Sequence, residues 1–308
     1  MKHLYKFIAL VFIFMIGIAF FSKSIPSISV STTTASSIQD STFPMVYLQV
    51  GESFINPLHG YSSELNSSTV RESITPLDTG KTFAVNIAEN DSKIKKLSYE
   101  LRDIANNKSI ETGDITAFDK NKKYKVATVH LKEAMDTSTE YGFCMTLITN
   151  YSKKIHFYTR IKYYDNDFFL SKKLDFVAKF HAATFDQGKS LDLSQYLESG
   201  TNDDSSYESV DIHSSRKLIT WGKLKPRKLT DVVPTVKELN IETAAISQTY
   251  FVSATTASGS ETYQVKEFYR VRYSGGRIYL LYFKRTMEAI FDPSLISINK
   301  SEVKIGIS

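Results

Sequence analysis

Cysteine is almost absent from this sequence, and its scarcity excludes two classes of protein. Cys144 is the single cysteine in 308 residues. One cysteine can form neither an internal disulfide framework nor a metal site built from clustered thiolates. The nucleophile elbow, the HExxH helix and the glycine-rich dinucleotide loop are also missing. The sequence therefore names no catalytic residue, no metal ligand and no cofactor, and we expect a protein that is not an enzyme.

A strong excess of one charge is missing too. Lysine and arginine total 38 and acidic residues 33, a formal charge of +5. On a chain of this length that excess does not by itself indicate nucleic acid as a partner. The hydrophobic fraction of 42% and the aromatic fraction of 13% are too high for a disordered protein. The length favours two cores over one.

The N-terminus has the pattern of a membrane anchor. Lys2 and Lys6 precede Phe7–Phe21, a run of fifteen residues without a polar side chain. A basic start followed by such a run is typical of a secretory signal or a signal anchor. We expect an uncleaved, single-pass signal anchor over residues 1–22, with all later residues outside the cytoplasm. The alternative is a protein secreted after the signal is cleaved.

A polar segment separates this anchor from the rest of the chain. From Ser22 to Thr42 the sequence has twelve serines or threonines among twenty-one residues. Such a composition cannot bury a core, so we expect residues 23–42 to form a flexible tether.

Residues 43–164 have the pattern of a β-sandwich. Apolar and polar residues alternate through Leu97–Leu101, Tyr141–Leu147 and Ile155–Tyr163. Strict alternation predicts antiparallel strands with one buried face. Several short strands separated by turn residues favour an immunoglobulin-like or fibronectin-like sandwich.

The hydrophobic period changes at the start of the next region, residues 165–308. Apolar positions and one histidine now repeat at helical spacing: Leu170, Leu174, Val177, His181 and Phe185. The spacing predicts a helix that Ser171 caps and that ends at Gly188.

β patterning returns after this helix. We expect a short helix over Ser190–Leu197 and then strands at Val210–Ile212, Leu218–Thr220, Ile241–Val252, Tyr263–Tyr273 and Ile278–Phe283. The Gly275-Gly276 pair predicts a tight hairpin between the last two strands. The fold class is therefore mainly β, with a second domain of α+β type built mostly from antiparallel strands.

Several short segments together resemble an uncharacterised group of membrane-anchored cell-envelope proteins from anaerobic Gram-positive bacteria. The segments are Asn56–Tyr61, Ile74–Leu77, Leu97–Arg102, Lys173–Phe176, Ile212–Ser215 with Trp221-Gly222, and Arg285–Glu288 with Ile290–Pro293. The resemblance implies an extracytoplasmic bacterial setting. It brings no activity and no catalytic residue with it.

The segment from Arg216 to Lys228 has the strongest local composition signal. It contains six basic residues among thirteen, no acid, and the single tryptophan of the chain. Outside the cytoplasm, basic and aromatic side chains together suit an anionic glycopolymer, a lipid headgroup or an acidic partner. The alternative is that the tryptophan packs in the core while the basic residues face solvent. The candidate binding residues are Trp221, Lys223, Lys225, Arg227 and Lys228.

Other polar residues have a functional and a structural interpretation. Asp211 and His213 are expected to share a strand face, where they could act as acid and base or as two metal ligands, with a third group such as Glu267 or Asp292. A solvent-facing strand explains that pair equally well. His181 lies on the apolar helix stripe, which favours a hydrogen-bonded core histidine.

One predicted strand also presents an aromatic and basic surface. Phe268, Arg270 and Arg272 fall on one face of Tyr263–Tyr273. Such a face either binds sugars by stacking or stabilises the sheet.

Three functions are compatible with these features. The first is a cell-envelope adaptor that binds anionic glycopolymer and is held to the membrane through Phe7–Phe21. The second is a regulatory ectodomain that contacts a membrane protein, such as a sensor or a secretion component. The third is a wall or polysaccharide hydrolase that uses Asp211 and His213. Nucleic acid is not expected as a partner.

Overall fold

The computed structural model describes most of the chain after residue 42. The described residues are Tyr5, Lys6, Met15 and the ranges 43–66, 69–121, 123–137, 139–165, 168–198, 206–256 and 259–290. Apart from those first three residues, the expected anchor (1–22) and tether (23–42) lie outside them. Across the described ranges, no helix is both long and apolar enough to cross a membrane. Residues 38–308 belong to one compact unit.

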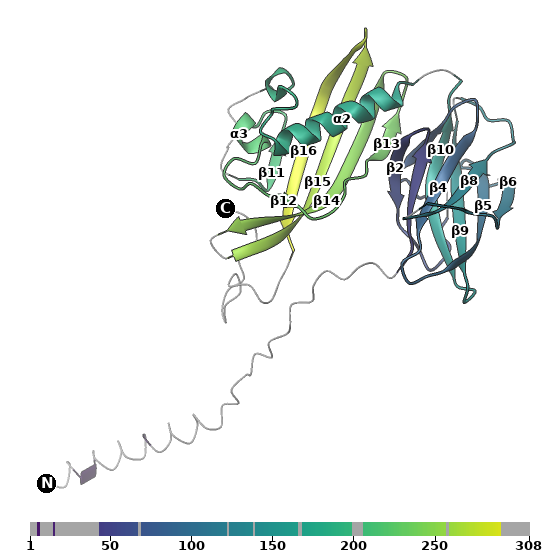
Figure 1. Cartoon of the computed structure of the whole chain (residues 1–308), viewed down its shortest axis with the longest axis horizontal. Helices are drawn as coiled ribbons and strands as arrows, with labels where there is room; N and C mark the ends of the chain where they lie inside the picture. The colour runs from purple at the N-terminus through teal and green to yellow at the C-terminus, as the bar shows by residue number, and fades with distance from the viewer. Residues whose placement is uncertain are drawn as a thin grey trace. The chain divides into compact units, whose positions relative to one another are not determined.

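The fold is mainly β, as the alternation of apolar residues predicts. Two five-stranded sheets come from the first part of the chain (Figure 1). The first sheet has the order β2-β1-β4-β8-β7, with bounds β1 Met45–Val50, β2 Ser53–Leu58, β4 Thr82–Ala88, β7 Asp119–Lys120 and β8 Lys125–His130. The second has the order β3-β10-β9-β5-β6, with bounds β3 Ile74–Leu77, β5 Ile94–Asp103, β6 Ser109–Ile115, β9 Glu140–Thr149 and β10 Lys154–Tyr163. All neighbouring strands in these sheets are antiparallel except β3 and β10.

Aromatic side chains join the two sheets. The rings of Phe83 on β4 and Phe143 on β9 meet edge to face, with centroids 5.3 Å apart. Tyr99 on β5 stacks on the same Phe143 ring at 5.7 Å. Phe83 and Phe143 are buried, so this contact removes a large apolar area from water. The strands predicted from alternation are confirmed as β5, β9 and β10, but β9 and β10 are buried on both faces over most of their length rather than on one.

A third sheet follows in the chain. Its order is β11-β16-β15-β14-β12, and β13 also pairs with β14. The bounds are β11 Ser209–Asp211, β12 Arg227–Lys228, β13 Thr235–Leu239, β14 Thr243–Thr256, β15 Gly259–Ser274 and β16 Arg277–Ala289. The predicted strands at Val210–Ile212, Ile241–Val252, Tyr263–Tyr273 and Ile278–Phe283 are confirmed to within a few residues.

The hairpin between β15 and β16 turns at the predicted glycines. Gly275 has φ 59° and Gly276 φ 79°, so both central residues of the turn are left-handed. Two successive positive φ values are the geometry of a type I′ turn, which matches the right-handed twist of the flanking strands.

Helix α2, Leu170–Phe185, lies across one face of the third sheet (Figure 1). Four residues of the predicted stripe, Leu170, Leu174, Val177 and His181, are buried, and His181 bonds Glu267 on β15. The neighbouring Phe180 ring contacts Tyr269 at 5.8 Å and Phe283 at 5.1 Å. The predicted cap at Ser171 is wrong. Phe169 occupies the N-cap position with φ 51°, and it makes no side-chain cap. Beyond the helix, Gly188 donates its N–H to the carbonyl of Ala183 at 2.7 Å, which satisfies one of the last carbonyls.

Two further local predictions are wrong. Leu218–Thr220 was expected as a strand, but the chain forms the short helix α3, Arg216–Ile219. The Ser215 hydroxyl accepts the N–H of Leu218 and so caps this turn. Ser190–Leu197 was expected as a helix, but only the 3-10 turn η1, Leu193–Gln195, forms there.

Strand β13 connects the third sheet to the first two. Asn56, in β2, is fully buried and has φ 51°. Its side chain donates to the Ile74 carbonyl and accepts the N–H of Val236, both at 2.8 Å. Its backbone N–H donates to the Pro234 carbonyl at 2.8 Å. One amide therefore ties β2, β3 and β13 together.

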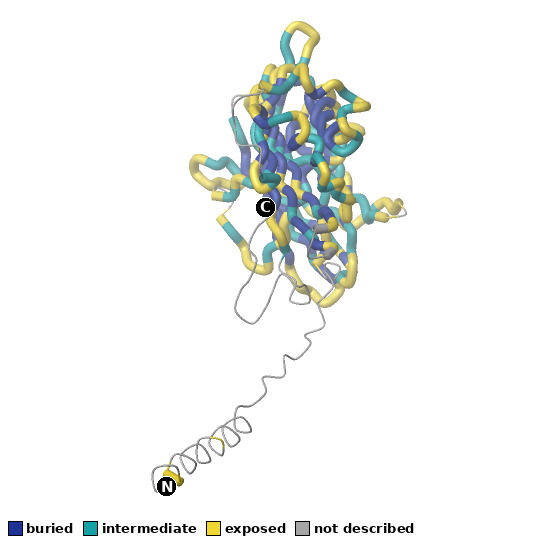
Figure 2. Tube along the Cα trace, turned by 90° about the vertical axis from the view of Figure 1, so that its left-hand side faces the viewer, coloured by how far each residue is buried: buried dark blue, intermediate teal, exposed yellow. Residues whose placement is uncertain are grey.

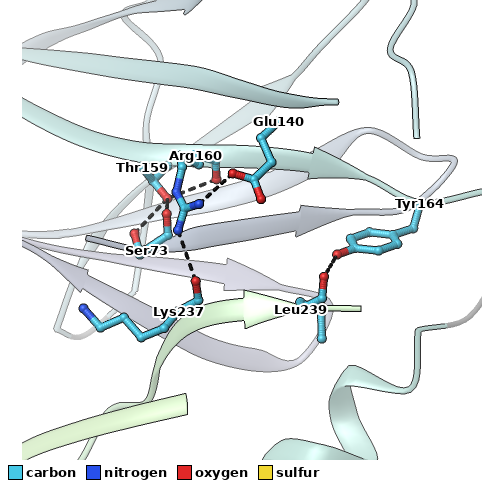
Figure 3. A network of polar contacts seen from close by, with 7 residues as sticks. All are labelled: Ser73, Glu140, Thr159, Arg160, Tyr164, Lys237 and Leu239. Carbon is cyan, nitrogen blue, oxygen red and sulfur yellow. Dashed lines mark hydrogen bonds and ion pairs between the residues drawn. The ribbon is translucent and has the colours of Figure 1, made fainter. Parts of the chain in front are cut away.

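Further polar contacts lie along the same junction (Figure 3). Arg160 on β10 pairs with Glu140 at 2.6 Å and donates to the Lys237 carbonyl at 3.1 Å. The hydroxyl of Tyr164 donates to the carbonyl of Leu239. Buried residues from β1 to β16 belong to one apolar cluster. The buried segments lie in the interior of the tube in Figure 2. The sheets are thus joined by a shared core.

Candidate functional site

The basic segment Arg216–Lys228 is not one continuous surface. It runs through α3, a turn, and β12, which pairs with β14 at the edge of the third sheet. The side chains of Lys223, Lys225, Arg227 and Lys228 are exposed. These four candidate residues are therefore accessible to an anionic ligand.

Trp221, the fifth candidate residue, is in the core. Only 1% of its surface is exposed. The guanidinium of Arg285 lies 3.4 Å from the centre of its ring, and the Phe185 ring lies 5.4 Å away. Trp221 cannot stack on a sugar from this position, and the arrangement is the alternative in which the tryptophan packs inward and the basic residues face solvent.

Arg285 explains why this tryptophan is held inward. The arginine is fully buried and donates to the carbonyls of Leu218 and Ile219, each at 2.8 Å. Those carbonyls belong to the end of α3, where helix carbonyls lack internal partners. Burial lowers the pKa of Arg285, while Tyr250 and Glu267 oppose that shift.

A buried carboxylate lies close to this arginine. Glu267 accepts hydrogen bonds from His181 Nδ1 at 2.8 Å, from the Tyr250 hydroxyl at 2.8 Å and from the Tyr269 hydroxyl at 2.7 Å. Burial disfavours its ionisation, but the contacts with His181 and Arg285 outweigh burial and lower the pKa of Glu267. His181 is therefore the hydrogen-bonded core histidine that the helix stripe predicts.

The Asp211 and His213 pair does not share a strand face. Strand β11 ends at Asp211, and His213 lies in the following turn. The His213 N–H donates to Asp211 Oδ1 at 2.9 Å, which is a turn contact. Glu267 pairs with His181 instead of joining them. In the described part of the chain, no three His, Cys, Asp or Glu residues are grouped to hold a metal.

The face of the β14–β16 sheet opposite α2, which we call the open face, gathers the remaining candidates. Along β15, residues 265, 267, 269 and 271 are buried, whereas Lys266, Phe268, Arg270 and Arg272 alternate with them toward solvent. Directly opposite residues of antiparallel strands share a face, so the register extends this surface across three strands and to β12. The aromatic and basic residues of the open face include Arg227, Phe251, Lys266, Phe268, Arg270, Arg272, Tyr279, Tyr282 and Lys284, and its acidic residues include Asp211, opposite Lys284, and Glu288.

Aromatic rings form the apolar part of the open face. Phe268 and Tyr282 meet edge to face with centroids 5.9 Å apart. Tyr279 and Tyr282 are 39% and 42% exposed. The guanidinium of Arg272 lies 5.2 Å from the centre of the Tyr279 ring. Rings that stay this exposed on a sheet face can stack on a ligand without moving.

Basic side chains outnumber acidic ones on the open face. Glu238 pairs with Arg270, and Glu288 lies 3.6 Å from Lys266. Over the described residues, Arg227, Arg272 and Lys284 form no ion pair with a carboxylate. Three cations therefore remain to attract an anionic ligand.

Part of the open face follows from the sequence and part does not. The alternation along β15 predicts that Phe268, Arg270 and Arg272 share one face, and the basic segment includes Arg227. Tyr282 and Lys284 join them only through the register of β15 with β16, in which Arg270 opposes Tyr282 and Phe268 opposes Lys284. No protein-family model matches this chain, and no curated protein matches it in sequence.

Proposed function

We propose that this chain is a binding protein of the bacterial cell envelope whose open face recognises an anionic glycopolymer. The observation that carries this proposal is the gathering of exposed aromatic rings and unpaired cations on one uncovered sheet face. Rings such as Tyr279 and Tyr282 offer flat apolar surfaces to sugar rings. Arg272 and Lys284 beside them offer positive charge to phosphate or carboxylate groups.

The envelope setting rests on the N-terminal sequence and on the resemblance. A basic start before Phe7–Phe21 supports export and retention by a signal anchor. Binding rather than catalysis is proposed because the open face presents stacking and charge without an acid and base pair. The basic residues Lys223, Lys225 and Lys228 would extend the attraction beyond the open face.

We further propose that residues 43–164 form an immunoglobulin-like sandwich and residues 165–308 a helix-plus-sheet domain. The order β1-β4-β8-β7 in one sheet and β10-β9-β5-β6 in the other supports this, because it corresponds to the ABED and GFC strands of that fold. A second support is Tyr141, near the start of β9, whose hydroxyl accepts the N–H of Asp136 at 2.9 Å. A tyrosine at this corner that bonds back to the preceding backbone is a mark of immunoglobulin domains.

The test measures polymer binding to the exported part, residues 38–308, by affinity electrophoresis and calorimetry. Polyglycerol phosphate is compared with a neutral glucan of similar length. We expect salt-sensitive binding of the anionic polymer. Replacing Arg272 and Lys284 by glutamine should weaken it by about tenfold, and Tyr282→Ala should weaken it by a similar factor.

A matched control keeps the charge change but moves it away from the open face. Lys108 is exposed in the turn between β5 and β6 and is replaced by glutamine together with Lys153, which is also exposed. This pair should leave binding unchanged. Equal binding by the open-face variants and the native chain, or no preference for the anionic polymer, would show that the proposal is wrong.

A further inference from the structure

A groove lies where the first sheet meets α2 and the edge of β14, and we call it the junction groove. Its volume is about 930 Å³, within the range of small-molecule sites in proteins. On the edge of β14 away from β15, the residues between those that pair with β12 and those that pair with β13 have no strand partner, because the chain bulges away over residues 230–233. The residues that matter for the argument are Tyr47, Tyr124, His181, Lys228, Asp231 and Gln248.

Gln248 provides the first indication of a ligand. It lines the groove with only 4% of its surface exposed. Its Oε1 atom has no hydrogen-bond partner among the described residues. Buried polar atoms are almost always hydrogen-bonded, because an unpaired acceptor loses its contacts with water and gains nothing in return. A donor from a bound molecule would satisfy this acceptor.

His181 and Lys228 provide the second indication. Glu267 fixes the His181 ring through Nδ1, and Lys228 Nζ lies 3.4 Å from the opposite nitrogen, Nε2. Lys228 therefore lies beside the one ring nitrogen of His181 that Glu267 does not bind. Lys228 also lies over the Phe185 ring, 4.8 Å from its centre. In the described chain no carboxylate pairs with Lys228, so its charge is available to an anion in the groove.

The opposite wall is aromatic. Tyr47 and Tyr124 line it with ring centroids 5.7 Å apart and an edge-to-face arrangement. Lys123 lies over the Tyr124 ring at 5.5 Å and pairs with Asp231 at 3.5 Å. Lys123 and Asp231 neutralise each other. Lys228 is therefore the cation of the groove that attracts an acidic ligand.

From these contacts we infer that the junction groove binds a small organic acid of monosaccharide size that carries hydroxyl or amide donors, such as a sugar acid. Its acid group would lie at Lys228, a hydroxyl or amide would donate to Gln248 Oε1, and its ring would pack against Tyr47 and Tyr124. This inference rests on Gln248 and His181, which lie on the α2 side of β14, and not on the residues of the open face; only Lys228 also adds to the charge that would attract the polymer.

The experiment uses three probes with residues 38–308, which form one compact unit. D-glucuronate has both the charge and the hydroxyl donors, D-glucose has the donors alone, and acetate has the charge alone. Binding is followed by saturation-transfer NMR and calorimetry. We expect saturable glucuronate binding, with glucose and acetate each weaker by about tenfold or more.

Two variants locate the site, each with a control that makes the same change on the open face. Gln248→Leu should weaken glucuronate by about tenfold, whereas Gln264→Leu should not. Lys228→Gln should weaken glucuronate while leaving glucose unchanged, whereas Lys266→Gln should affect neither probe. Thermal melting of each variant shows that it is folded.

Two results would overturn the inference. One is the absence of saturable glucuronate binding up to roughly 10 mM, far weaker than a built site requires. The other is unchanged glucuronate affinity in both folded groove variants. Polyglycerol phosphate binding is measured separately, on the open-face variants. The two sets of measurements therefore show which of the two proposals fails.

Discussion

The guanidinium of Arg285 stacks on the ring of Trp221, 3.4 Å from its centre, and neither side chain reaches solvent. The most basic segment of the chain therefore contributes its single tryptophan to the core. Burying an arginine is costly unless its charge and donors are compensated. Here the Trp221 ring, the Leu218 and Ile219 carbonyls and the nearby Glu267 compensate the charge and both terminal nitrogens, whereas Nε has no hydrogen-bond partner among the described residues.

The first prediction concerns this arginine. Arg285→Met should lower the free energy of unfolding by about 3 kcal/mol, because it removes the guanidinium donor from the Ile219 carbonyl, leaves the Leu218 carbonyl with backbone donors alone and removes a compensating charge from Glu267. Urea denaturation followed by Trp221 fluorescence measures the change. Arg272→Met on the open face is the control and should cost less than about 0.5 kcal/mol. A small effect of Arg285→Met would mean that the stacked pair does not stabilise α3.

The second prediction concerns pH. Glu267 has a pKa below its ordinary value of 4.5, so its ionised form stabilises the folded protein above that value. This stabilisation is lost as the pH falls through the lower pKa of the folded state. Glu267→Gln presents amide donors where three donors already converge, so it should lower stability at pH 7 by about 3 kcal/mol.

The difference between this variant and the native chain should shrink as the pH falls below 4.5 and through the lower pKa of the folded state, because protonation removes the charge of the native carboxylate. Denaturation curves between pH 3 and 7 measure that difference. Glu288→Gln, at an exposed position of β16, is the matched control and should show little effect at any pH. A constant difference over the whole range would contradict a lowered pKa for Glu267.

The third prediction concerns the junction. Asn56→Ala should lower stability by about 2–4 kcal/mol, because it removes side-chain bonds to Ile74 and Val236 and leaves a left-handed backbone without asparagine. Hydrogen exchange should show faster exchange at Val236 than in the native chain. Asn90 also has a positive φ but lies in a surface turn, so Asn90→Ala should cost less. Equal losses in the two variants would mean that the buried junction contacts of Asn56 contribute no more than the exposed bond of Asn90 to the Phe43 carbonyl.

The fourth prediction concerns the corner before β9. Tyr141→Phe removes the acceptor for the Asp136 N–H and should lower stability by about 1 kcal/mol. Tyr151→Phe changes a fully solvated ring in a turn and should be neutral. Equilibrium unfolding in urea distinguishes the two. A neutral Tyr141→Phe would weaken the argument for an immunoglobulin-like corner.

Local patterns in the sequence were sufficient for most strands. Alternation in Tyr141–Leu147 and Ile155–Tyr163 predicts β9 and β10, because one face of each strand must be apolar to be buried. The helical spacing of Leu170 to Phe185 predicts the helix α2, although the predicted cap at Ser171 is wrong and the helix ends before Gly188. Gly275-Gly276 predicts the β15–β16 turn, because only glycine adopts two successive positive φ values without strain.

The errors arose where tertiary contacts overrule local preference. Leu218–Thr220 has the composition of a strand, yet Ser215 caps a helical turn there and Arg285, distant in sequence, binds its carbonyls. Phe169 adopts a left-handed conformation at the start of α2, and its ring packs against Tyr273 at 4.5 Å. No pattern within these segments could indicate partners from β15 and β16.

By itself, the sequence determined the β-rich class, the long helix, the tight hairpin and the basic segment, because each depends on neighbours within a few residues. Only the tertiary structure decided which side chains reach a ligand. It buried Trp221 beneath Arg285 and brought Tyr282 and Lys284 beside Phe268 and Arg270 through strand register. It also placed Gln248 against His181 and Lys228 in the junction groove. The position of each of these side chains depends on pairing between segments that are distant in sequence, and its burial depends on packing between those segments. Neither the position nor the burial can be predicted from local periodicity.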